Sequence, residues 1–79
     1  TTKWHALEKY MAKNNFVKED VIAFGDSGND MEILSNVGFA VAMKNADDKV
    51  KEICHDVTKY TNDEDGVGRY ILEQLLKAL

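Results

Sequence analysis

Residues 25–30 read Gly-Asp-Ser-Gly-Asn-Asp, so two carboxylates, an amide and a hydroxyl lie within six positions. Asp26 lies at the tip of an apolar run that ends at Gly25, and Asp30 lies four residues later, where a helix is expected to begin. The two carboxylates can therefore face one spot. Mg²⁺ prefers oxygen ligands and is commonly held by one or two carboxylates, water and a substrate phosphate. Glycine permits close backbone approach to an anion, and a helix N-terminus adds N–H donors.

The same loop also suits a purely structural role. Asp, Ser, Gly and Asn favour strand-to-helix turns, and Asn29 with Glu32 three residues later resembles a capping box. Asp30 in a first helical turn would also interact favourably with the helix macrodipole. An EF-hand fits poorly, because Met31 and Val37 replace its required Gly and Glu. The local chemistry alone favours capping over metal binding.

Helical and strand patterns alternate along the chain and would position this loop. Apolar residues at helical spacing occur within residues 4–11, 31–37, 46–54 and 71–79. Unbroken apolar runs at 21–24 and 39–43 are typical of strands covered on both faces, whereas the more polar segment 57–61 suits an edge strand. Thr1 or Thr2 is expected to cap the first helix, which should stop at Asn14-Asn15, and Asn45 to cap the third.

This alternation predicts an α/β fold: a three-layer, Rossmann-like parallel sheet fragment with about three strands and four helices. In such sheets ligands bind at the carboxyl ends of the strands. The segment from Gly25 to Asp30 follows the run 21–24 directly and would lie at that edge. Any chemistry is therefore expected there.

Composition limits the classes of partner. The 79 residues make one small domain at most, with a net charge of −4 and Lys and Arg scattered along it. This argues against nucleic acid or an anionic membrane as a partner held by charge, and no apolar run is long enough to span a membrane. Cys54 is the single cysteine, which suits a reducing compartment, so we expect a cytoplasmic protein.

An ordered series of short motifs resembles a known family. Residues 25–34, Gly-Asp-Ser-Gly-Asn-Asp-Met-Glu-Ile-Leu, are similar to the fourth motif of the haloacid dehalogenase (HAD) superfamily, most closely its Cof-type sugar-phosphate phosphatases. The likeness continues in order through residues 38–46, 50–51, 56–58 and 62–67. Lys3 fits the third motif, a lysine that opens the preceding helix. An ordered series over almost the whole chain is more specific than any one of its motifs.

The resemblance implies a role for four residues. Asp26 would be a direct Mg²⁺ ligand, and Asp30 a second acidic member of the metal site that holds a coordinated water. Asn29 would face the substrate phosphate. Lys3 would be catalytic, because it neutralises the nucleophile and the phosphoryl group during transfer. The implied activity is Mg²⁺-dependent hydrolysis of small phosphorylated metabolites such as sugar phosphates.

Three parts of the family pattern are missing from residues 1–79, one of which is the Thr/Ser strand of its second motif. No Asp-x-Asp followed by Thr or Ser comes after an apolar run, and no cap domain is present. Residues 1–79 would then be the C-terminal part of a HAD-like core domain, inactive alone. The strand at 21–25 would lack its neighbour, so self-association or pairing with the N-terminal part is expected. The alternative is a small acidic α/β interaction module or degenerate homologue, with no metal and no catalysis.

Overall fold

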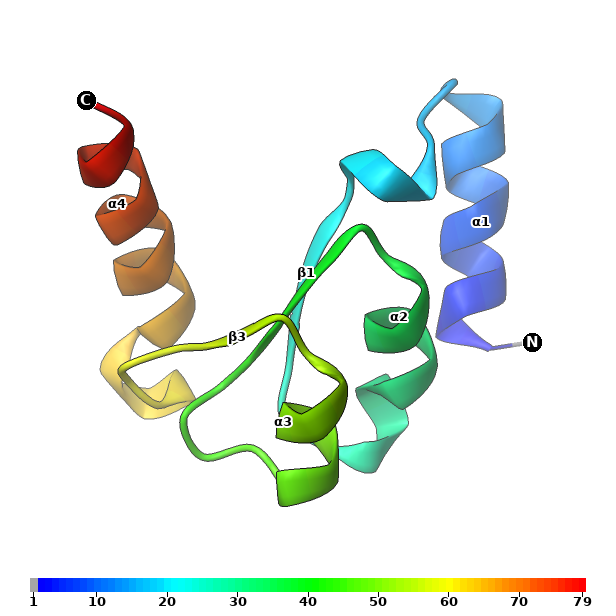
Figure 1. Cartoon of the computed structure of the whole chain (residues 1–79). Coiled ribbons are helices and arrows are strands. Elements are labelled where there is room, and N and C mark those ends of the chain that lie inside the picture. Colours follow the sequence, from blue (N-terminus) through cyan, green and yellow to red (C-terminus); the bar gives the residue numbers. More distant parts are fainter. Residues whose placement is uncertain (1) are drawn as a thin grey trace.

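Three short strands form a parallel sheet in the order β1-β2-β3 (Figure 1). They are β1 (Ile22–Gly25), β2 (Phe39–Ala42) and β3 (Asp56–Val57). Ile22 lies opposite Phe39, and Ala42 opposite Val57. The computed structural model describes residues 2–79.

Four α-helices and three short 3₁₀ turns connect the strands. The α-helices are α1 (Lys3–Lys13), α2 (Met31–Asn36), α3 (Asp48–Ile53) and α4 (Gly66–Ala78). The 3₁₀ turns are η1 (Lys18–Asp20), η2 (Gly28–Asp30) and η3 (Asn62–Glu64). The predicted α/β fold with three parallel strands and four helices is confirmed. No helix within residues 2–79 has the length and apolar character that a membrane crossing requires.

Successive residues of β1 face opposite sides of the sheet, and helices cover both sides. Ala23 packs against the buried cluster that includes Leu34 of α2, and a Cβ atom built on Gly25 would lie 2.8 Å from Leu34 Cδ1. Phe24 points the other way, where its ring meets that of Tyr70 of α4 edge to face at 5.5 Å. This alternation explains why the run is apolar throughout.

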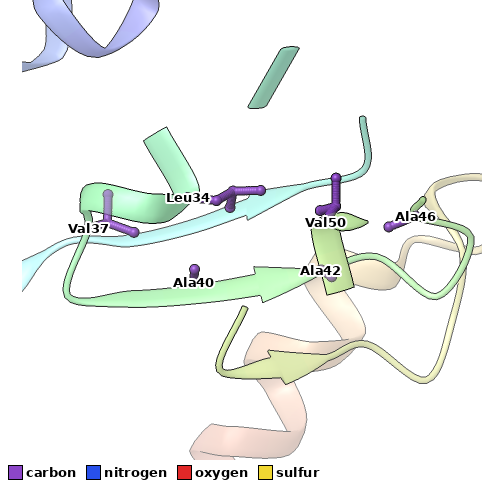
Figure 2. Packing of buried hydrophobic residues seen from close by; sticks show 6 residues of the cluster. All are labelled: Leu34, Val37, Ala40, Ala42, Ala46 and Val50. Carbon is purple, nitrogen blue, oxygen red and sulfur yellow. The ribbon is translucent and has the colours of Figure 1, made fainter. Parts of the chain in front are cut away.

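The main core lies between β2 and the helices α2 and α3 (Figure 2). Its buried members are Leu34, Val37, Ala40, Ala42, Ala46 and Val50. Small alanines on β2 let the larger side chains of both helices reach the sheet closely, so α2 is held directly against the strands that flank the loop at 26–30. Trp4 of α1 packs on the edge of the same cluster.

The first helix begins and ends where the sequence indicated. Thr2 is its N-cap, with the hydroxyl oxygen accepting the His5 N–H at 3.1 Å. The other expected cap, Thr1, lies outside the described residues. The helix stops at Asn14, and Asn15 adopts a left-handed backbone with φ of 61°.

Two predicted boundaries were wrong. The third helix is not capped by Asn45 but begins at Asp48 after Asp47, because Asp47 N–H donates to Asp26 O and residues 43–46 form a turn. The third strand is Asp56–Val57 rather than 57–61. It ends because Thr58 bends the chain: its hydroxyl donates to Tyr60 O at 2.6 Å.

Helix α4 is attached to the sheet through Tyr70. Its phenol donates to Asp56 Oδ2 at 2.8 Å. Burial and the bond to Asp56 raise the pKa of Tyr70 to about 12, so the phenol keeps its proton at neutral pH. The rest of the helix has a broad apolar surface: Leu72, Leu75 and Leu76 are each more than half exposed. An open groove of about 330 Å³ lies between this surface and Ile22 of β1.

The edge of β1 that faces away from β2 has no strand partner among residues 2–79. Ile22 on this strand is 49% exposed, and β1 carries no charge, Pro or bulge that would prevent edge pairing. We therefore predict that the chain associates through β1 and the adjoining groove, either with a second copy or with an N-terminal part of its own protein.

Light scattering at increasing concentration tests this prediction. Ile22→Lys should lower the average molar mass, because it puts a charge on the edge. Val17→Lys is the matched control, since Val17 is 53% exposed and lies outside the sheet. A chain that stays monomeric, with the β1 amides as protected from hydrogen exchange as those of β2, would refute the prediction.

Candidate functional site

The residue after β1 lies where the carboxyl ends of all three strands converge. The backbone of the segment after β2 holds it there: Met43 N–H donates to Gly25 O at 2.9 Å, and Asp47 N–H donates to Asp26 O at 3.1 Å. Thr58 N–H, just beyond β3, donates to Ala42 O at 2.8 Å. Asp26 thus occupies the position at which parallel α/β sheets bind ligands.

The carboxylate of Asp30 folds back onto the start of its own loop. Asp30 Oδ2 accepts the N–H of Asp26 at 3.1 Å and that of Ser27 at 3.3 Å. Together with the Ser27 side chain, which accepts the Asp30 N–H, it forms a capping box at η2. The capping box that the sequence suggested, Asn29 with Glu32, is not the one that forms. The capping residue is Ser27, because the helical turn begins two residues earlier.

This fold-back requires glycine at position 25. A Cβ atom there would lie 2.8 Å from Asp30 Cβ and 3.0 Å from Asp30 Oδ2. Contacts that close would push Asp30 away from the two amides. Gly28 is different, since a Cβ atom on it would meet nothing within 4 Å.

The carboxylate of Asp26 has one oxygen held by a distant residue. Asn62, on η3 and 36 positions later, places Nδ2 2.7 Å from Asp26 Oδ2. A carboxylate only accepts hydrogen bonds, so the amide NH₂ is the donor. Within residues 2–79, no protein hydrogen bond occupies Asp26 Oδ1.

The other two predicted site residues differ in placement. Asn29 lies exposed in the same turn as Asp30, between the two carboxylates in sequence. Lys3 lies exposed in the first turn of α1, which packs against α2. Among residues 2–79, no hydrogen bond or ion pair joins Lys3 to either carboxylate. The structure thus gathers Asp26, Asn29 and Asp30 in one loop, and the roles of all four residues remain predictions.

The donor set is compatible with a hard divalent cation. Two carboxylates at a strand end each accept hydrogen bonds through Oδ2. No group of three or more His, Cys, Asp or Glu that could hold a metal occurs in the described part of the chain. Two carboxylates are the number that Mg²⁺ commonly takes from a protein, since it keeps several of its waters.

Asn62 contacts the candidate site, but its residue type and position in the sequence did not predict this. A single Asn in an acidic turn is a common turn former. The signal that could have found it was the similarity of residues 62–67 to the family pattern, which extends beyond what a turn requires.

Comparisons with known proteins agree with this geometry. A family model described as haloacid dehalogenase-like hydrolase matches residues 1–71. The 5-amino-6-(5-phospho-D-ribitylamino)uracil phosphatase YitU of Bacillus subtilis is 50% identical over 67 residues, which are 85% of this chain and 24% of that protein. Phosphoglycolate phosphatase 1 of Saccharolobus solfataricus is 42% identical over 72 residues, which are 90% of this chain and 30% of that protein.

A solved structure shows the same fold. The crystal structure of a haloacid dehalogenase-like hydrolase from Bacteroides thetaiotaomicron matches with a TM-score of 0.85 and 38% identity, over 91% of this chain and 27% of that one. The chain thus spans less than a third of the length of these relatives. The resemblance to HAD proteins and their Cof-type phosphatases, predicted from the ordered motifs, is confirmed. The chain belongs to the haloacid dehalogenase-like hydrolase family.

Proposed function

We propose that the protein containing these residues is a Mg²⁺-dependent phosphatase that hydrolyses phosphate monoesters of small metabolites such as sugar phosphates. The observation that carries the proposal is the position of Asp26 and Asp30 in one loop at the carboxyl end of β1. The names of two relatives support the substrate class, since one acts on a phosphoribitylamino compound and the other on phosphoglycolate. The lone, partly buried Cys54 is compatible with a cytoplasmic location.

In this proposal Asp26 binds Mg²⁺ directly and Asp30 holds a coordinated water. When bound, Mg²⁺ stabilises the negative charge that develops on the phosphoryl oxygens. The chain's contribution is to fix the ligand: Asp30 anchors the backbone of residues 26 and 27, so the Asp26 side chain leaves the strand from a fixed point. A fixed carboxylate loses little freedom when the cation binds.

Asn29 and Lys3 would act on the substrate. Asn29 is exposed in the turn between the two carboxylates, where its amide can donate to a phosphate oxygen. Lys3 would neutralise the nucleophile and the transferring group, as a lysine does for phosphoryl groups in other enzymes. Lys3 is exposed on the first turn of α1, and no carboxylate of residues 2–79 forms an ion pair with its ammonium.

A second candidate rests on the capping box. Because Asp30 already accepts two backbone N–H groups, the loop has a structural role that needs no cation. The chain would then be a degenerate homologue or a small acidic interaction module. Metal binding that depends on Asp26 separates the two candidates.

We predict that Mg²⁺ shifts the backbone amide resonances of residues 25–31 in an NMR titration of this chain. Asp26→Ala should abolish these shifts, because it removes the direct ligand. Asp20→Ala is the matched control, since Asp20 lies in η1 before β1, at the other end of the same strand. Shifts that are absent in the unsubstituted chain, or that survive in Asp26→Ala, would contradict the metal site and favour the second candidate.

We also predict that residues 1–79 alone do not hydrolyse an aryl phosphate in the presence of Mg²⁺. Covalent catalysis in this family starts from an Asp on a strand that this sequence does not contain, and Asp26 and Asp30 are committed to the metal. Release of aryl alcohol and phosphate would be followed over hours against a buffer blank. Turnover above that blank that disappears in Asp26→Asn would mean that this loop supplies the chemistry itself.

A further inference from the structure

The contact between Asn62 and Asp26 joins two sites that are remote in sequence, and neither side chain is buried. Exposed hydrogen bonds between long-separated side chains contribute little to stability, since water competes for both groups. The geometry is nevertheless short and charge-assisted, at 2.7 Å from Nδ2 to Oδ2.

The turn that carries Asn62 is fixed on both sides. Before it, Thr58 Oγ1 accepts the Lys44 N–H at 2.9 Å, which ties the segment after β3 to the one after β2. On η3 itself, Thr61 N–H donates to Glu64 Oε1 at 3.0 Å in a second capping box. Hydrogen bonds from the backbone and hydroxyl of Thr61 lower the pKa of Glu64.

The far side of the turn is closed by the start of α4. Gly66 N–H donates to Thr61 O at 2.9 Å, and Asp65 adopts the left-handed backbone that the return requires, with φ of 58°. Gly66 is buried, and a Cβ atom on it would lie 2.6 Å from Met43 Cε and 2.8 Å from Thr61 O. The turn therefore packs directly on the end of β2, beside the loop that holds Asp26.

The position of Asn62 thus follows from backbone and capping contacts that do not involve Asp26. Its amide is presented to one oxygen of that carboxylate by a turn held in place independently. A single Asp side chain on an open loop has several rotamers, and a fixed donor on Oδ2 selects among them. Oδ1 is left without a protein hydrogen bond in the described residues and can face a cation.

We infer that Asn62 is a positioning residue for the metal site, which holds the Asp26 carboxylate through Oδ2 so that Oδ1 is presented to Mg²⁺. The inference rests on the proposed function, in which Asp26 is the direct ligand. Hydrogen-bonded partners of metal-binding carboxylates orient the ligand, and their loss typically weakens metal affinity about 10–100-fold. Asn62 acts through Asp26 and need not touch substrate.

The test compares two isosteric substitutions by Mg²⁺ titration of the full 79-residue chain, following the amides of residues 25–31. Asn62→Leu keeps the side-chain size but removes the donor, and should weaken Mg²⁺ binding about 10-fold. Asn45→Leu is the matched control: Asn45 is also exposed, lies in the loop after β2, and should leave the affinity unchanged. In the unsubstituted chain, the Asn62 side-chain NH₂ resonances should shift with the same midpoint as the Asp26 amide.

Three outcomes would overturn the inference. If Asn62→Leu binds Mg²⁺ within twofold of the unsubstituted chain while Asp26→Ala does not bind, the metal site stands and Asn62 has no part in it. If Asn62→Leu lowers the Mg²⁺ affinity but also narrows the spread of the amide resonances of residues 39–43, the substitution has disturbed the fold and the contact is structural. If the unsubstituted chain shows no Mg²⁺ shifts at all, the proposed function and the inference both fail.

Discussion

The return of the Asp30 carboxylate onto the amides of Asp26 and Ser27 is the interaction on which the loop depends. A chain that leaves a strand and enters a helical turn exposes N–H groups that lack helical partners. Here one side chain satisfies two of them and closes the turn within four residues. The absence of a side chain at Gly25 allows this, because a Cβ atom would occupy the space of Asp30.

The sheet gives this loop its surroundings. Parallel strands bring their carboxyl ends to one edge, so segments that follow β1, β2 and β3 meet there. Backbone bonds from Met43 and Asp47 hold the first of these segments to the second. The turn after β3 adds Asn62 from the other side. The six-residue loop is thus supported by contacts from two distant parts of the chain, which is the kind of support that the proposed metal site would need to hold a carboxylate in place.

The sequence predicted what depends on periodicity and on ordered motifs. The apolar runs at 21–24 and 39–43 indicated β1 and β2, because helices pack on both sides of the sheet. The sequence left Thr1 and Thr2 as alternative caps of the first helix, and Thr2 caps it. The sequence alone could not decide between two capping boxes that are equally good locally. Ser27 with Asp30 and Asn29 with Glu32 share the same spacing, and the structure has the first pair, for which the missing side chain at Gly25 leaves room.

Long-range bonds explain the remaining errors and omissions. Asn45 is a good helix cap locally, but the bond from Asp47 N–H to Asp26 O delays the helix. Thr58 suits a strand, yet its hydroxyl bonds bend the chain after β3. The contact of Asn62 with Asp26 spans 36 positions, so no local pattern could indicate it.

In the proposed cation site, the fold-back of Asp30 onto the amides that follow β1 fixes the Asp26 carboxylate, and this fold-back requires Gly25. The most direct measurement is hydrogen exchange of the Asp26 and Ser27 amides, together with a Mg²⁺ titration, in Gly25→Ala and in Gly28→Ala. Gly25→Ala should speed exchange of both amides and abolish the Mg²⁺ shifts, because its Cβ atom would displace Asp30. Gly28→Ala should change neither, because its Cβ atom would meet nothing within 4 Å. Slow exchange and unchanged Mg²⁺ binding in Gly25→Ala would show that the proposed cation site does not depend on the fold-back of Asp30.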